Sequence, residues 1–229
     1  MARTFVIGDI HGAWKALIQC FERSSFDGDR DMLISLGDAC DGWPQVYQAV
    51  DELMKVKNLV YILGNHDQWA LTWALKGSMP MVWLMQGGQA TIDSYRGQMP
   101  DNHRKFFSSA RLHYLSDDRL FVHGGIDPAR PLNEQDTDTL IWDRSLVEQA
   151  CAMRDKTKKV SITGYREVYL GHTPTLNFNS SVPLSFCECW LMDTGAGYHG
   201  RLTMMDIGTK EYFQSDPVPQ LYSGYSGRF

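Results

Sequence analysis

Residues 4–12 read TFVIGDIHG, in which an apolar run stops abruptly at Gly-Asp and is followed by a histidine and a second glycine. Four more apolar runs stop in a similar way, with glycine close to aspartate, asparagine or histidine. They are SLGDACDG (35–42), LGNHDQW (63–69), FVHGG (121–125) and YLGHT (169–173). Because glycine permits the tight turns that point polar groups inward, the pattern predicts strands whose ends share one kind of chemistry.

Segments with helical spacing separate the first three of these runs. Residues 12–23 space their large apolar side chains as a helix does, Pro44 is placed to open a helix over 44–56, and 67–75 is a third candidate. This βαβαβ order predicts a parallel sheet with right-handed crossovers. The carboxyl ends of the strands in such an open sheet point into one crevice, so polar residues far apart in the sequence are expected to meet there.

We expect a single α/β domain over residues 1–229, with one insertion and one tail. The segments MVWLMQGG (81–88) and HRKFFSSARLHYL (103–115) look helical and predict a helical cap insertion over 76–118. The Pro/Gly/Ser-rich residues 215–229 are expected to form a surface tail.

The second half of the chain returns to strands after the insertion. One long helix is expected over 140–155, where LIWDRSLVEQACAMRD carries apolar residues at helical spacing. The apolar stretches at 187–195 and 201–207 are expected to be strands, joined as a hairpin across GAGYHG (195–200).

Bulk composition excludes several classes of protein. The chain has 229 residues, 43% of them hydrophobic, which suffices for a sizeable core. Its formal net charge of -5 gives no basic footprint for a nucleic acid partner. No apolar segment approaches the roughly 20 residues of a membrane span, and no charged leader opens the chain, so we expect a cytoplasmic protein without a membrane partner. The 5 cysteines lack regular spacing and are expected to be reduced. The sequence indicates no oligomeric state.

The strand ends carry a set of side chains suited to one metal-dependent site. They are Asp9, His11, Asp38, Asp41, Asn65, His66, His123 and His172. Carboxylates, an amide oxygen and imidazoles suit manganese, iron or zinc, and a bridging carboxylate would create the two-metal arrangement that serves phosphoryl displacement. Each motif alone is typical of an ordinary turn or helix cap. Five such motifs at the ends of comparable predicted strands favour a shared site over five independent turns.

Five motifs in this order resemble the calcineurin-like metallophosphoesterases. They are GDIHG (8–12), GDACDG (37–42), GNHD (64–67), HGG (123–125) and GHT (171–173). The ending MDTGAGYHGRLTMMDI is similar to the phosphoprotein phosphatase branch, which includes bacterial and phage Ser/Thr protein phosphatases and symmetrical diadenosine tetraphosphatases. The resemblance spans residues 5–207 and implies an αββα sandwich, in which two central β-sheets are flanked by helices.

The resemblance also implies a role for each motif residue. Asp9 and His11 would bind a first metal ion, Asp38 would bridge both ions, and Asn65, His123 and His172 would bind the second. His66 would protonate the leaving oxygen while Asp41 holds its imidazole. Arg144, in IWDRSL, would grip the substrate phosphate, and Asn65 would contact it as well.

The implied activity is a two-metal phosphatase that hydrolyses phosphomonoesters by direct attack of a metal-bridging hydroxide. Phosphoserine or phosphothreonine in a protein is the favoured substrate, and a small phosphoester is the other expected partner. Two divalent ions are implied, with manganese favoured and iron, zinc or magnesium as alternatives. The same metals would serve a dinucleoside polyphosphate hydrolase, such as a diadenosine tetraphosphatase. A catalytically silent, metal-dependent binding module is a third alternative.

One position departs from the family pattern. The second motif usually places an arginine that holds phosphate after its second aspartate, and here Gly42 stands in that place. Arg96, Arg166 and Lys15 are the candidates for a replacement. Asp67 stands where that branch commonly has glutamate; we expect it to orient local backbone and assign it no catalytic role.

Overall fold

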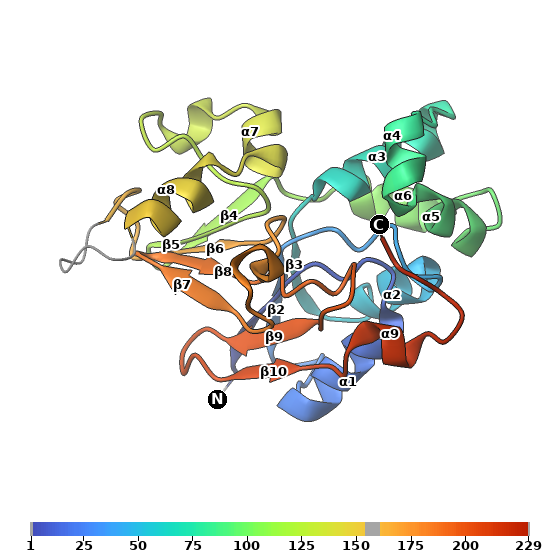
Figure 1. The fold of residues 1–229 in the computed structure, drawn as a ribbon, viewed down its shortest axis with the longest axis horizontal. Coiled ribbons are helices and arrows are strands. Elements are labelled where there is room, and N and C mark those ends of the chain that lie inside the picture. Colours follow the sequence, from blue (N-terminus) through green and yellow to red (C-terminus); the bar gives the residue numbers. More distant parts are fainter. Residues whose placement is uncertain (1, 154–160, 229) are drawn as a thin grey trace.

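The computed structural model describes residues 2–153 and 161–228, and its strands form two five-stranded sheets (Figure 1). The first sheet has the order β10 (Tyr212–Gln214), β9 (Thr203–Asp206), β1 (Thr4–Ile7), β2 (Met32–Ser35) and β3 (Asn58–Tyr61). The strands β1, β2 and β3 are parallel, as their order in the sequence predicts, while β9 and β10 add an antiparallel edge.

The second sheet has the order β4 (His113–Ser116), β5 (Arg119–Val122), β6 (Glu167–Leu170), β8 (Cys189–Leu191) and β7 (Leu184–Phe186). Its central strands β5, β6 and β8 are parallel. The predicted hairpin between 187–195 and 201–207 is wrong, because β8 belongs to this sheet and β9 to the first. The intervening segment therefore crosses from one sheet to the other, and β8 pairs antiparallel with β7 instead.

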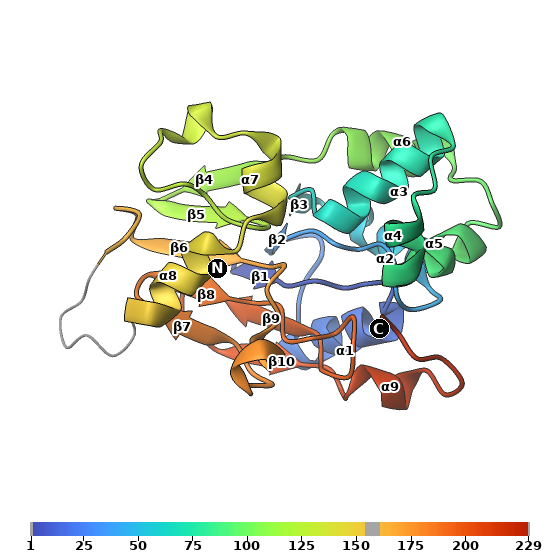
Figure 2. The ribbon, with the colours of Figure 1, turned by 45° about the horizontal axis from the view of Figure 1, so that its top comes forward.

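Alternating side chains bury both faces of each sheet, which produces the four layers of an αββα sandwich. Val6, Phe121 and Tyr169 point into the layer between the sheets, where the Phe121 and Tyr169 rings stack with centroids 4.8 Å apart. Their neighbours Phe5 and Leu120 point outward into separate clusters that helices cover. Helices α1 (Trp14–Ser24) and α2 (Val46–Leu53) flank the first sheet, and α7 (Thr137–Trp142) and α8 (Ser145–Met153) flank the second (Figure 2).

The segment expected to form a cap is helical as far as residue 108. It follows α3 (Asn65–Lys76) with α4 (Met81–Trp83), the π-helical turn η1 (Leu84–Gly88), α5 (Gln89–Ser94) and α6 (Asp101–Ser108). The predicted helix over 103–115 is wrong in its second half, where His113–Ser116 form β4. Pairing with β5 gives these residues a hydrogen-bonded partner that the local helical pattern does not show.

The helix expected over 140–155 is broken into α7 and α8. Asp143 ends α7, and its carboxylate accepts hydrogen bonds from the backbone N–H of Ser145 (3.1 Å) and its hydroxyl (2.6 Å). Aspartate favours such local turns over helix interiors. The break frees the backbone carbonyl of Trp142, and residues 154 and 155 lie outside the described ranges. Two further short turns are η2 (Leu132–Glu134) and η3 (Thr175–Phe178).

The described part of the expected tail, residues 215–228, is fixed against the domain by buried side chains. It contains α9 (Val218–Leu221), and Val218 and Tyr222 insert into the cluster that covers the first sheet. The Tyr222 ring stacks on Trp43 with a centroid distance of 5.3 Å. Residue 229 lies outside the described ranges. Among the described helices, none is both long and apolar enough to cross a bilayer.

We predict that Phe121→Ala lowers the free energy of unfolding by about 3–5 kcal/mol, because it leaves a cavity in the layer between the sheets. Tyr212→Ala, at a position 43% exposed on the edge strand β10, is the matched control, with an expected change below about 1 kcal/mol. Urea titrations followed by circular dichroism measure both. Equal losses for the two variants would contradict this packing of the sheets.

Candidate metal centre

The predicted site residues lie together at the carboxyl ends of parallel strands from both sheets. Asp9 and His11 follow β1, Asp38 follows β2, and Asn65 and His66 begin α3 after β3. His123 follows β5 and His172 follows β6. The chain reaches the site through strained backbone, since φ is positive at four non-glycine site residues: His11, Asp38, Asp41 and His172. Such conformations cost free energy and concentrate at functional sites.

The first candidate metal-ligand group consists of Asp9, His11 and Asp38, all buried. His11 Nε2 lies 3.9 Å from Asp9 Oδ2 and 3.8 Å from Asp38 Oδ2. Two ligands that share one ion through bonds of about 2.0–2.2 Å lie at comparable separations. The backbone N–H of His172 donates to both oxygens of Asp9, at 3.2 and 3.1 Å, so the two sheets are tied together at this point.

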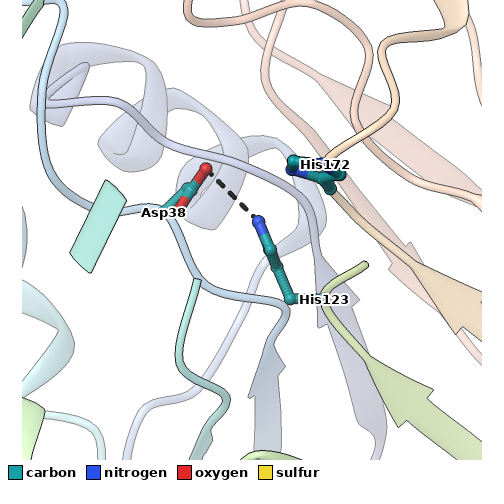
Figure 3. A group of neighbouring side chains, drawn as sticks. All are labelled: Asp38, His123 and His172. Atoms are coloured by element: carbon teal, nitrogen blue, oxygen red, sulfur yellow. Dashed lines mark ion pairs between the residues drawn. The ribbon is translucent and has the colours of Figure 1, made fainter. Parts of the chain in front are cut away.

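The second group consists of Asp38, His123 and His172 and shares Asp38 with the first (Figure 3). His123 Nε2 lies 3.3 Å from Asp38 Oδ2 and 3.0 Å from the amide oxygen of Asn65. One oxygen of Asp38 therefore faces a histidine from each group. No side chain fits between Asp38 and α3, because a Cβ at Gly64 would collide with the Asp38 carboxylate.

Backbone carbonyls orient the three histidines of these groups. Nδ1 of His11 lies 2.9 Å from the Cys40 carbonyl oxygen, and Nδ1 of His123 lies 2.7 Å from that of Leu36. With Nδ1–H as the donor, Nε2 of each ring is left to bind a metal ion. His172 is turned the other way, with Nε2 3.1 Å from the carbonyl oxygen of Trp142, which leaves Nδ1. Such second contacts are usual for metal-binding histidines.

The charges of the buried side chains favour a bound cation. Burial, together with the neighbouring negative charge of Asp193, raises the pKa of Asp9 well above its ordinary value. Burial also raises the pKa of Asp193 to about 6. Burial lowers the pKa of His172 to about 2 and that of His11 well below its ordinary value, which favours the neutral form of imidazole that can bind a metal ion. A concentration of buried carboxylates beside neutral imidazoles fits divalent ions.

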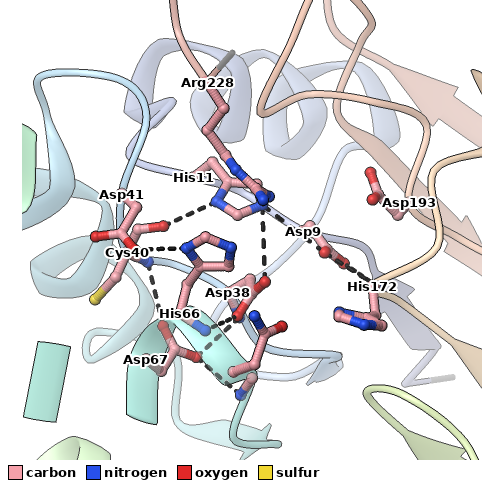
Figure 4. Close-up of polar contacts among 12 residues, drawn as sticks. Asp9, His11, Asp38, Cys40, Asp41, His66, Asp67, His172, Asp193 and Arg228 are labelled. Atoms are coloured by element: carbon pink, nitrogen blue, oxygen red, sulfur yellow. Dashed lines mark hydrogen bonds and ion pairs between the residues drawn. The ribbon is translucent and has the colours of Figure 1, made fainter. Parts of the chain in front are cut away.

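His66 and Asp41 form a pair beside these groups (Figure 4). His66 Nδ1 lies 2.5 Å from Asp41 Oδ2, and both side chains are almost fully buried. The cap fixes Asp41, because Trp83 Nε1 donates to Oδ2 at 2.8 Å and the Thr91 hydroxyl donates to Oδ1 at 2.6 Å. The sequence gives no sign that Trp83 and Thr91 act on Asp41, because contacts across about 40 to 50 residues depend on how the cap folds back.

Asp67 organises the backbone of this region, as the sequence leads us to expect. Its carboxylate accepts from the backbone N–H of Asp38 at 2.8 Å, Cys40 at 3.2 Å and Gly64 at 3.1 Å, and from the Tyr61 hydroxyl at 2.7 Å. It therefore joins the ends of β2 and β3. Burial raises the pKa of Asp67 to about 6, and the negative charge of Asp38 adds to this shift.

Of the cations predicted to contact phosphate, Arg144 lies near the centre, and the three candidates for a replacement at Gly42 lie elsewhere. Arg144 is exposed at the break between α7 and α8, close enough for its charge to contribute to the low pKa of His172. Arg96 is exposed after α5, and Arg166 is exposed before β6, at the end of that strand away from His172. Lys15 donates to the carbonyl of Leu221 at 2.8 Å. The structure therefore brings none of the three substitutes to Gly42.

The side chain beside Gly42 belongs to Arg228, which the sequence does not single out. Its Cγ would lie 3.2 Å from a Cβ at position 42, and its Nη1 lies 2.9 Å from His11 Nε2. The glycine in place of arginine at position 42 is the one sequence feature that points to a missing cation. It cannot indicate a residue 186 positions further along the chain.

The profile of the calcineurin-like phosphoesterases matches residues 2–201, which is most of the chain. The protein belongs to this family. This calcineurin-like phosphoesterase is therefore a metal-dependent phosphoric ester hydrolase. The family is binuclear, and the two ligand groups that share Asp38 agree with two ions.

Known relatives of this phosphoesterase act on different substrates. Serine/threonine-protein phosphatase 1 of Salmonella typhimurium is 27% identical over 212 residues, which are 89% of this chain and 91% of that protein. The symmetrical bis(5'-nucleosyl)-tetraphosphatase of Buchnera aphidicola is 35% identical over only 65 residues, 28% of this chain and 23% of that protein.

Solved structures share the fold of this phosphoesterase. A metallophosphoesterase from Sphaerobacter thermophilus is 14% identical, has a TM-score of 0.61 and aligns over 94% of this chain and 89% of its own. A protein serine/threonine phosphatase from Saccharomyces cerevisiae is 16% identical, has a TM-score of 0.58 and aligns over 90% of this chain and 73% of its own. At these identities the likeness concerns the fold alone.

We predict that Asp67→Asn lowers the free energy of unfolding by about 3 kcal/mol, because the amide cannot accept from all four donors and leaves buried N–H groups unpaired. Asp93→Asn is the matched control, with an expected change within about 0.5 kcal/mol, since Asp93 is exposed and keeps an oxygen to accept from Gln89. Urea titration at neutral pH compares the two. An unchanged midpoint for Asp67→Asn would show that the strand ends do not depend on this carboxylate.

Proposed function

We propose that this phosphoesterase is a two-metal phosphatase for phosphomonoesters, with phosphoserine and phosphothreonine in proteins as its favoured substrates. One observation carries the proposal: Asp38 Oδ2 lies between a histidine of each ligand group, 3.8 Å from His11 and 3.3 Å from His123. A single carboxylate oxygen at that position suits a bridge between two ions. The buried His66–Asp41 pair stands beside it.

The proposed ligands divide between the two groups. Asp9, His11 and Asp38 would hold one ion, and Asp38, Asn65, His123 and His172 the other. Bound divalent ions would stabilise charge on the phosphoryl oxygens and lower the pKa of a water molecule for the attack. Manganese is the proposed metal because oxygen and imidazole ligands suit it, although such ligands also accept iron, zinc or magnesium.

His66 is the proposed general acid. The hydrogen bond from its Nδ1–H to Asp41 fixes the ring and leaves Nε2 for the leaving oxygen. An alkoxide from serine or threonine is a poor leaving group, so a proton delivered by the imidazole ring of His66 would accelerate its departure. Trp83 and Thr91 hold the Asp41 carboxylate on its remaining sides and so keep His66 in place.

Arg144 and Asn65 are the proposed contacts to the substrate phosphate. Asn65 starts α3, so its side chain and the positive end of a helix face the same anion. Arg144 is exposed near His172, where its planar guanidinium can contact two phosphate oxygens without rearrangement of the core.

The choice of protein substrate is supported by the extent of the similarity to each relative. The sequence similarity to serine/threonine-protein phosphatase 1 extends over 89% of this chain, whereas the sequence similarity to the symmetrical tetraphosphatase of Buchnera aphidicola covers 28% of it. The fold does not separate the two activities, because a structure of a putative diadenosine tetraphosphatase also aligns over 93% of this chain. The second activity remains the alternative, because both kinds of hydrolase use the same motifs. A silent binding module is disfavoured by the retained His66–Asp41 pair, since metal binding alone does not require it.

We predict hydrolysis of p-nitrophenyl phosphate and of a phosphoserine peptide that depends on added Mn²⁺. Asp38→Ala removes the shared ligand, so the bound metal should fall below two ions per chain and activity should be lost. Glu148→Ala, which removes an exposed carboxylate from α8, should retain both. Metal analysis after gel filtration and steady-state assays give the two measurements. Two bound ions without turnover of any phosphoester would establish the binding module instead.

A second prediction concerns His66. His66→Asn should lower kcat for the phosphoserine peptide by roughly 10²–10⁴-fold with unchanged metal content, because the leaving alkoxide loses its proton donor. The loss should be smaller for p-nitrophenyl phosphate, whose leaving group is stable as an anion. His113→Asn, on β4, is the control and should act like wild type. An equal loss on both substrates would contradict the role of general acid.

A third prediction separates the two substrate classes. Rates with diadenosine tetraphosphate and with a phosphothreonine peptide, measured in competition on the Mn²⁺-loaded protein, should give a kcat/KM at least tenfold higher for the peptide. A preference for the dinucleotide would overturn the choice of substrate and leave the two-metal chemistry intact.

A further inference from the structure

Arg228 carries a guanidinium group from the tail into the candidate metal centre (Figure 4). Besides the 2.9 Å contact with His11 Nε2, its Nη2 donates to the side-chain oxygen of Gln86 at 3.1 Å. The guanidinium also lies over the Tyr198 ring, 4.9 Å from its centroid. The loop after β1, the cap and the segment after β8 therefore all contact this one side chain of the tail.

The site is shaped to receive the stem of Arg228. A Cβ at Gly42 or at Gly87 would lie 3.2 Å from its Cγ, and a Cβ at Gly197 would lie 3.2 Å from its Cδ. The backbone N–H of Arg228 donates to the carbonyl of Gly197 at 2.8 Å. Gly227, which precedes it, has a φ of 68°. Three glycines and a fixed backbone thus form a groove that admits this side chain.

Two features indicate that the guanidinium has a further binding partner in the working protein. Its Nε is buried and has no hydrogen-bond acceptor among the described residues. Its Nη1 is directed at His11 Nε2, the atom that the Nδ1 contact with Cys40 leaves for a metal ion. Because guanidinium is always charged and cannot itself bind a metal, it cannot keep this contact when His11 acts as a ligand.

We propose that Arg228 binds the phosphoryl group of the substrate, at the place where Gly42 provides no cation. The inference rests on the proposed function. In the structure the positively charged guanidinium lies 2.9 Å from His11 Nε2, the atom proposed to bind a metal ion. Divalent ions bound in the centre would supply that positive charge, and the guanidinium would then be free to bind an anion. Its stem stays in the groove, so only the planar end needs to turn.

The planar guanidinium of Arg228 has the geometry to bind a phosphate group. Nε–H and an Nη–H donate in parallel, and a phosphoryl group offers two oxygens at the matching spacing. Arg144 follows Trp142, whose carbonyl contacts His172, and Arg228 contacts His11, so the two cations belong to different sides of the centre. A phosphoryl group that spans both sides would contact a guanidinium at each end.

Inorganic phosphate titrated into Mn²⁺-saturated protein, followed by calorimetry, tests the proposal without turnover. Arg228→Ala should weaken phosphate binding by roughly 10- to 100-fold, because two charge-assisted hydrogen bonds are lost. Arg228→Lys keeps the charge but not the fork and should recover only part of the affinity. Arg96→Ala removes an exposed arginine of the cap and should bind phosphate as wild type does.

The kinetic measurement runs in parallel, with the metal content of each variant checked first. For Arg228→Ala the inhibition constant of phosphate and the KM for p-nitrophenyl phosphate should rise together. Unchanged phosphate affinity in Arg228→Ala would overturn the proposal, and tighter affinity would show that Arg228 obstructs the site. If wild type bound phosphate and metal but hydrolysed no phosphoester, the proposed function would fail, while the titrations would still decide the role of Arg228.

Discussion

The four hydrogen bonds accepted by the buried carboxylate of Asp67 are the contact on which the rest of the centre depends. They tie the backbone of Asp38 and Cys40, after β2, to Tyr61 and Gly64 at the end of β3. Asp38 can face both ligand groups only if that loop holds its left-handed conformation. The first turn of α3 carries Asn65, His66 and Asp67 together, so the residue that fixes the loop and the proposed ligand and acid share one rigid element.

Charge is the second constraint on the architecture. Several carboxylates and imidazoles are buried where two sheets meet, and burial opposes the charged form of each. Such a cluster is tolerable when cations balance it, and both the metal ions that the family uses and the guanidinium of Arg228 can do so. In this structure the guanidinium of Arg228 supplies a balancing positive charge. In the proposed enzyme the metal ions would supply that charge, and the guanidinium would bind the substrate phosphate.

Sequence motifs correctly predict which side chains lie together at this centre, because each proposed ligand lies within a few residues of the strand that carries it. The family resemblance and the βαβαβ order correctly predict the two central sheets and the parallel β1, β2 and β3. The wrong predictions concern which strand a segment pairs with, and not the spacing of its apolar residues. Residues 113–116 pair with β5 in place of continuing a helix, and β8 and β9 belong to different sheets although only a short turn-rich segment separates them. Local patterns do not record which distant strand a segment will meet.

The amino-acid sequence by itself determined the family, the strand-end residues proposed as metal ligands and the absence of an arginine at position 42. These depend on short motifs whose geometry is set by local turns and glycines. Only the tertiary structure decided that Trp83 and Thr91 of the cap hold Asp41, and that Arg228 of the tail occupies the groove beside Gly42. Those contacts join segments more than 40 residues apart, and they exist because burial of Val218, Tyr222 and the cap helices brings the segments together. Packing, which acts on the whole chain at once, leaves no signature in any one stretch of sequence.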